Sequence, residues 1–364
     1  MRLLRARAQH LTDETAIAGT VREVVAAMGA IQAQAMPAAV LAIRPRSRGL
    51  TASDVGRALD QERSVVRTWA MRGTLHLVAA EDVAWMTSLL GPISAARGRS
   101  RRRQLGIDDA LAERAVAAMR RLLAGGPLTR AELIQGMAAS RIAFEGRSQG
   151  PIHLIALAAM QGLVVYGPDR KGKETFVLLQ DWIGRARPMN PERAARELAR
   201  RYVTAHGPAE AVDFAAWSGL PIGMAREAAG AAAPPPQPSP IKREGGSASV
   251  RLLPAFDEYL LGWASRAFAF SSELERRLQR GGGWIHPAVV VDGRGIAAWL
   301  MERRARRQEV AVEAFERISP AIAAGIQAEV ADLGRYLGVQ IALQRVTTAS
   351  DRRHHPESIL TVDK

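Results

Sequence analysis

The sequence predicts a helix-rich α+β protein in which a unit of three helices followed by a two-stranded ribbon occurs more than once. Two observations carry this prediction. The chain has 364 residues, which is too long for one small core and favours two or three domains. Apolar residues recur at helical spacing and are followed by short apolar runs on either side of polar, glycine-containing turns.

The clearest copy of this unit covers residues 107–190. Helices are expected over 110–123, from 129 onward and over 153–161, followed by strands over 163–166 and 175–179. Thr129 precedes the second helix and Glu132 follows three residues later, which is the capping-box pattern. Three helices followed by a two-stranded ribbon describe a winged helix, a variant of the helix-turn-helix.

Residues 1–106 repeat this order. Helices are expected over 20–29, from Pro37 and after 51–54, with strands over 65–70 and 74–78. A weaker third copy occupies 191–230, with helices through Arg201 and over 209–218. The sequence therefore predicts three related units in series.

The remaining segments differ in character. Residues 231–249 are rich in proline, glycine and serine, which predicts a low-complexity, disordered linker. The remainder of the third domain and a C-terminal β/α region are assigned to 250–350. Within it we expect a strand from 250, a β-hairpin with the turn Asp292-Gly293, and a helix over 321–337. Residues 351–364 are expected to be a frayed tail.

The charge balance indicates a polyanionic partner. Lysine and arginine number 50 against 36 aspartates and glutamates, which gives a net charge of +14. Nucleic acid is the simplest partner, because bound cations release counterions from phosphates. A genome bias toward arginine codons would explain arginine over lysine, but not cations over anions. The arginine runs at 97–103 and 303–307 fit a solvated face and phosphate contact equally well.

Several classes of function and location are excluded or unsupported. The chain has no cysteine, so disulfides, thiol catalysis and thiolate metal sites are excluded. The pair His354-His355 has no third ligand at metal spacing, and neither a metal nor an organic cofactor is expected. No apolar run approaches the roughly 20 residues of a membrane span, and the charged first residues are unlike a signal peptide. A cytoplasmic protein is predicted.

The first candidate site is the pair Gln32 and Gln34. Gly29 ends the preceding helix and Pro37 disfavours helical geometry at Met36, so the pair is expected on non-helical backbone. Residues i and i+2 of extended backbone point the same way, which would present both amides together. Glutamine is a poor base and nucleophile, but it can hold a water beside a substrate that carries its own positive charge, such as an alkylated purine. On spacing alone, two solvated loop glutamines fit better.

Basic residues elsewhere are candidates for DNA contact. Arg67 begins a predicted hairpin and Arg72 lies at its tip, where both could meet phosphates. His76, on the same hairpin, is a better candidate for an orienting or structural histidine than for a proton donor. Arg44 and Arg266 are further candidates for DNA contact.

With these residues the chain resembles the bacterial winged-helix DNA-binding family that includes the DNA glycosylases of the AlkZ and YcaQ type. The matching segments are 5–9, 31–34, 67–78, 127–133, 214–220 and 252–262, the last being the most specific. The resemblance implies three tandem winged helices with a concave surface that clasps DNA. It also implies monofunctional removal of bulky N7-alkylated purines, in some members including interstrand crosslinks. The family's Gln-x-Gln catalytic motif falls on Gln32 and Gln34, whereas a sister branch has aspartate at the second position.

The chain departs from the family pattern at three places. Ala35 stands where an acidic residue is usual, and the linker at 231–249 stands where strands of the third unit would be expected. The run 281–284 stands where an Asn-Gly pair is commoner.

Three hypotheses follow for the function. The preferred one is a monomeric DNA glycosylase that acts on alkylated or crosslinked double-stranded DNA. The second is a non-catalytic winged-helix transcriptional regulator, because winged helices are mostly regulators. The third is a DNA-binding relative that has lost activity, which Ala35 and the linker allow.

Overall fold

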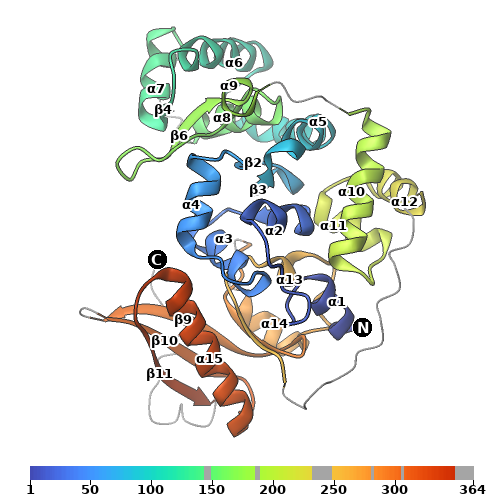
Figure 1. Cartoon of the computed structure of the whole chain (residues 1–364). Coiled ribbons are helices and arrows are strands. Elements are labelled where there is room, and N and C mark those ends of the chain that lie inside the picture. Colours follow the sequence, from blue (N-terminus) through green and yellow to red (C-terminus); the bar gives the residue numbers. More distant parts are fainter. Residues whose placement is uncertain (143–148, 185–188, 232–247, 280–282, 305–306, 349–364) are drawn as a thin grey trace.

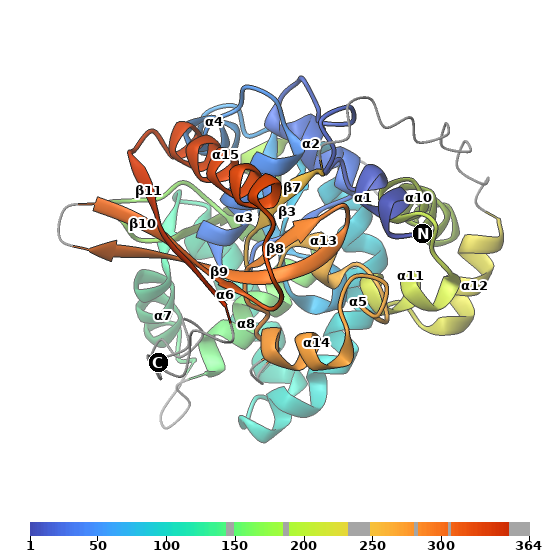
Figure 2. The same ribbon diagram turned by 90° about the horizontal axis from the view of Figure 1, so that it is seen from below.

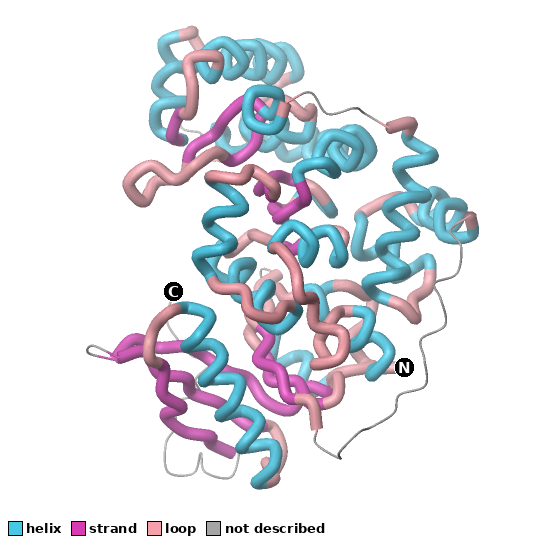
Figure 3. Tube along the Cα trace, viewed as in Figure 1, coloured by secondary structure: helices cyan, strands magenta, loops and turns pink. Residues whose placement is uncertain are grey.

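The computed structural model describes residues 1–142, 149–184, 189–231, 248–279, 283–304 and 307–348. Helices dominate, and the strands form three separate sheets (Figure 3). The helix-rich α+β class is therefore confirmed. Most of the expected linker at 231–249, part of the glycine run at 281–284, and the whole tail at 351–364 lie outside the described residues.

The first unit follows a short helix α1 (Arg2–Ala8). Its elements are α2 (Val21–Met28), β1 (Ile31–Gln32), α3 (Met36–Ile43), α4 (Ala52–Asp60), β2 (Val65–Trp69) and β3 (Leu75–Ala79). The strands form a sheet in the order β1-β3-β2. Capping boxes begin α2 at Thr20 and α4 at Thr51, so local hydrogen bonds fix both starts.

The second unit repeats the first. Its elements are α6 (Asp109–Leu123), β4 (Leu128–Thr129), α7 (Arg130–Ala139), α8 (Gly150–Met160), β5 (Val164–Tyr166) and β6 (Thr175–Leu178). Its sheet has the equivalent order β4-β6-β5, and the predicted capping box of Thr129 with Glu132 is present. The expected helices and strands of both units are confirmed. The two-residue strands β1 and β4 were not predicted.

One long helix, α5 (Ala80–Gln104), connects the two units (Figure 1). The second unit packs closely on α5 at Gly91, where a Cβ would lie only 1.9 Å from the carbonyl oxygen of Met160. Trp69 of β2 also stacks on Tyr166 of β5, with 5.5 Å between ring centroids. The arginine run at 97–103 lies on the last two turns of α5.

The contact at Gly91 makes a testable prediction for stability. Gly91→Ala is expected to lower the free energy of unfolding by about 1–3 kcal/mol or more, since the methyl group meets backbone that must move. Gly56, in the exposed middle of α4, has open space at its Cβ position. Gly56→Ala should therefore raise the free energy of unfolding by roughly 0.5–1 kcal/mol. Urea denaturation of both variants checks this, and equal effects would contradict the packing.

The third copy differs from the other two. The helices α10 (Pro191–His206), α11 (Ala211–Ser218) and α12 (Ile222–Gly230) follow the expected order, and α9 (Leu179–Ile183) precedes them. Within the described part of the chain, no three-stranded sheet of their own follows these helices. They pack instead on α5 and α2, in a core shared with the first unit. The arrangement of three winged helices therefore remains a proposal.

The C-terminal part builds a five-stranded sheet in the order β11-β10-β9-β8-β7. Its strands are β7 (Val250–Leu253), β8 (Ala288–Val291), β9 (Arg294–Arg304), β10 (Arg307–Ala314) and β11 (Ile341–Thr348). Along the chain, the helices α13 (Glu258–Leu261) and α14 (Ser272–Leu278) come after β7 and before β8. The helix α15 (Pro320–Leu337) lies across the sheet (Figure 2). The predicted hairpin is confirmed, with positive φ at both Asp292 and Gly293.

The expected strand from 250 and helix over 321–337 are confirmed as β7 and α15, while β10 and β11 were not predicted. None of the helices described is long and apolar enough to cross a membrane.

Candidate active site

Gln32 and Gln34 lie beside the turn that joins β2 to β3. Gln32 pairs with His76 across the β1–β3 ladder, and the Ala33 amide donates to the Leu75 carbonyl oxygen at 2.7 Å. The side-chain oxygen of Gln32 accepts a 2.7 Å bond from Nη2 of Arg72, and that of Gln34 accepts a long 3.4 Å bond from the Leu75 amide. Each carbonyl oxygen keeps a second lone pair for another donor.

The two glutamines differ in exposure. Gln34 is exposed, whereas Gln32 is only 7% exposed. The non-helical backbone was predicted correctly, but the expectation that both amides are presented together did not include this difference in exposure. The difference arises because Arg72 bonds to the Gln32 side chain and holds it at the edge of the interior.

Arg72 is more buried than its predicted position at a hairpin tip suggested. Its φ of 56° is left-handed, and its Nη1 donates to the carbonyl oxygen of Trp217. Burial lowers its pKa, an effect that Glu258 partly offsets. Its guanidinium therefore orients Gln32, in place of the phosphate contact that the sequence suggested.

Arg67 supports the backbone between the two glutamines. It is buried, and its Nε donates to the Ala33 carbonyl oxygen at 3.2 Å. The guanidinium lies 4.3 Å from the ring centroid of Tyr166 and pairs with Glu174. Because these partners occupy Arg67, the structure gives it a bracing role where the sequence suggested phosphate contact.

His76 is a structural residue in this arrangement. It is fully buried, and its Nδ1 lies 2.9 Å from the Thr74 carbonyl oxygen, to which a protonated Nδ1 donates. Burial, with a smaller effect of Arg72, lowers its pKa to about 3. A neutral histidine at pH 7 is a poor proton donor, and one without exposure does not contact DNA.

Arg44 and Arg266 form bonds inside the protein. The Arg44 side chain is 1% exposed and donates to Glu329 at 2.7 Å and to Asp332 at 2.8 Å. Arg44 thereby holds α15 against the first unit, and almost none of its side chain is exposed for the DNA contact that the sequence suggested. Arg266 donates to Glu275 at 2.8 Å, so it too is committed to an internal ion pair.

Two buried carboxylates were missed from the sequence, and one of them bonds directly to Gln32. Glu258 accepts a 2.8 Å bond from the Gln32 backbone amide and a 3.0 Å bond from the indole of Trp217. Its neighbour Asp257 forms two 2.7 Å bonds with Arg46, and both side chains are fully buried. Burial raises the pKa of Glu258. A pair of acidic residues inside the apolar run 252–262 was the available signal, since buried carboxylates need partners.

Buried histidines predict how stability depends on pH. Burial lowers the pKa of both His76 and His206 to about 3, from an ordinary 6.5. Between those values the unfolded chain binds protons that the folded chain does not. The free energy of unfolding should therefore fall as pH drops below 6.5, by up to about 1.4 kcal/mol per pH unit for each histidine.

The variant His206→Phe tests this dependence, because the ring of His206 stacks on Tyr202 at 4.5 Å and a phenyl ring can replace it. The urea midpoint of the variant should decline less steeply than that of wild type between pH 6.5 and about 5. Parallel declines would show that His206 is protonated equally in both states.

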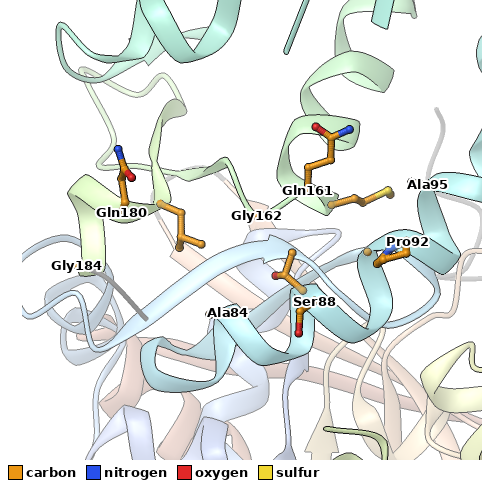
Figure 4. A pocket seen from close by; sticks show the side chains of 12 residues that line it. Ala84, Ser88, Pro92, Ala95, Gln161, Gly162, Gln180 and Gly184 are labelled. Carbon is orange, nitrogen blue, oxygen red and sulfur yellow. The ribbon is translucent and has the colours of Figure 1, made fainter. Parts of the chain in front are cut away.

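A surface groove lies elsewhere in the molecule (Figure 4). Its volume is about 620 Å³, and it runs between α5, the end of α8 and α9, with Ser88, Pro92, Gln161 and Gln180 among its lining residues. Neither glutamine of the motif lines it, so it is separate from the candidate site. Among the residues that the structure describes, no cluster of three or more histidine or acidic side chains could hold a metal ion.

Comparison with known proteins identifies the family. A family model described as DNA glycosylase AlkZ-like matches residues 25–336. The chain belongs to the AlkZ-like DNA glycosylase family. An interstrand DNA cross-link repair glycosylase of Streptomyces sahachiroi is 27% identical over 341 residues, which cover 87% of this chain and 91% of that protein.

The fold agrees with this membership. The solved structure of Streptomyces sahachiroi DNA glycosylase AlkZ superposes with a TM-score of 0.79 at 24% identity, covering 95% of this chain and 98% of the other. The resemblance seen in the sequence is thus confirmed. The alternative of a non-catalytic transcriptional regulator is not favoured for an AlkZ-like glycosylase.

Proposed function

We propose that this AlkZ-like glycosylase hydrolyses the N-glycosidic bond of bulky N7-alkylated purines in double-stranded DNA, and that its substrates include interstrand crosslinks. The observation that carries the proposal is the exposed amide of Gln34 beside the anchored amide of Gln32, each with an unused lone pair on its oxygen. The relative that is named an interstrand cross-link repair glycosylase supports the choice of lesion.

The chemistry suits carboxamides because the leaving group is already activated. Alkylation at N7 makes the purine cationic, so the base departs readily and the sugar develops oxocarbenium character. The oxygens of Gln34 and Gln32 would accept hydrogen bonds from one water and hold it near C1′. Their dipoles would also stabilise the growing positive charge on the sugar. Because a carboxamide forms no Schiff base, the reaction would stop at an abasic site, which makes the enzyme monofunctional.

The DNA is proposed to bind by its phosphates to basic side chains around this site. The net charge of +14 favours such binding, and exposed arginines lie on α5 and, with Arg303, on β9. We further propose that three winged-helix units, with the domain limits expected from the sequence, form a concave surface that binds the DNA. The protein is proposed to act as a monomer. A bulky or crosslinked base needs an open site, in contrast to enzymes that enclose an extruded base.

The test is abasic-site formation on duplexes that carry one 7-methylguanine or one nitrogen-mustard crosslink. The wild-type protein should release the methylated base in any sequence context and unhook the crosslink, and Gln34→Ala should do both much more slowly. Binding without any base release would leave a DNA-binding relative that has lost activity. Undiminished release by Gln34→Ala would eliminate the assignment of the glutamines.

A further inference from the structure

Gln32 and three residues distant from it in sequence form a closed ring of hydrogen bonds. Glu258 accepts from the backbone amide of Gln32, and the Gln32 side-chain oxygen accepts from Arg72. Arg72 donates in turn to the carbonyl oxygen of Trp217, whose indole donates to the second oxygen of Glu258. Glu258 thus uses both carboxylate oxygens, and each link passes to a different segment of the chain.

The backbone around the ring is shaped to let it close. Gly219, two residues after Trp217, has a φ of +79°, and a Cβ there would lie 3.0 Å from the Cα of Arg72. Gly29, before Gln32, leaves space for the indole, since its Cβ would lie 3.4 Å from that ring. A side chain at Gly219 would press on the backbone of Arg72, which would have to shift, whereas a Cβ at Gly29 would be in ordinary contact with the indole.

We propose that Glu258 is a positioning residue for base release, which acts through this ring to fix the amide of Gln32. The inference rests on the proposed function, in which Gln32 helps to orient the attacking water. Glu258 itself is fully buried and does not contact the substrate. Its effect reaches the site through the Gln32 backbone on one side and through Trp217 and Arg72 on the other.

The ring leaves Gln32 little freedom. Its backbone amide and its side-chain oxygen are both held, so the remaining lone pair of that oxygen has a fixed direction. The guanidinium of Arg72 is partly buried, and Glu258 is the carboxylate whose charge favours its charged form. Without that charge, Arg72 would be better solvated outside the ring, and Gln32 would lose its donor.

The experiment compares Glu258→Gln with a matched control, Glu329→Gln. Glu329 is also a largely buried carboxylate that accepts from a backbone amide, at Leu252, and from an arginine, Arg44, but it lies on α15, away from the ring. In Glu258→Gln, the new amide nitrogen must face one of the two donors. Single-turnover release of 7-methylguanine should fall by about 10-fold or more, with DNA affinity within twofold of wild type. Glu329→Gln should lower stability and leave the rate of the folded protein unchanged.

Two more variants keep the test decisive. Trp217→Phe removes one link and should slow base release by several-fold. In the double variant Glu258→Gln, Trp217→Phe, the rate should equal that of Glu258→Gln alone, because the ring is already open. A wild-type rate of base release in folded Glu258→Gln would overturn the proposal. If Glu258→Gln does not fold, a wild-type rate in Trp217→Phe would overturn it.

A structural readout separates this inference from the proposed function. If wild type releases no base at all, the proposed function fails, and nuclear magnetic resonance still tests the ring. Trp217→Phe should then shift both the backbone and the side-chain amide signals of Gln32, as should Glu258→Gln. Unchanged Gln32 signals in both variants would show that the ring does not position that residue.

Discussion

Asp257→Ala should lower the free energy of unfolding by about 3–5 kcal/mol, because the substitution leaves the charge of Arg46 buried and uncompensated. Arg46 also donates to the Ala42 carbonyl oxygen and to the side chain of Gln9, so the pair lies at a junction of three segments. Asp257 further accepts from the amide of Tyr259 at the start of α13. Urea denaturation followed by circular dichroism measures the loss.

The control for this prediction is Asp332→Ala. Asp332 also bonds a buried arginine, Arg44, but its side chain is 36% exposed and Glu329 remains as a second partner. Asp332→Ala should lower the free energy of unfolding by about 1 kcal/mol or less. If both aspartate variants unfold at the same urea concentration, Arg46 and Asp257 do not hold the junction together.

Gln34→Ala is expected to slow single-turnover release of 7-methylguanine by about 10²-fold, the usual scale for losing one group that stabilises a transition state. DNA affinity should change little, because a neutral amide contributes little to phosphate binding. Gln34→Glu keeps an acceptor of the same length and should retain more activity than the alanine variant. Equal losses in the two variants would show that accepting a hydrogen bond from water is not the role of Gln34.

Much of the fold was predictable because its signals are local. Thr129 with Glu132 starts α7, Asp292 with Gly293 closes the β8–β9 hairpin, and both act over a few residues. Helix α5 was missed for a physical reason. Its buried apolar residues lie between Val83 and Leu90 and its second half is rich in arginine, so no apolar stripe runs along the whole helix.

The motif of Gln32 and Gln34 could be located from the sequence, but not the roles of the arginines. Whether an arginine meets a phosphate or a carboxylate depends on residues that are near only after folding. Arg44 finds its partner Glu329 across 285 positions. Glu258 reaches Gln32 across 226 positions. No local pattern encodes such pairs, and only the unusual acidic residues in an apolar run gave an indication of them.

In the proposed reaction, two neutral amides hold one water against the sugar of a lesion. The most direct test is the crystal structure of the protein bound to a duplex that contains a cationic pyrrolidine nucleotide, which mimics the oxocarbenium ion. We expect an ordered water within about 2.7–3.2 Å of the Gln34 side-chain oxygen, bonded also to Gln32 and facing the position of C1′. A mimic bound with Gln34 turned away, or with the water held by other groups, would contradict the account.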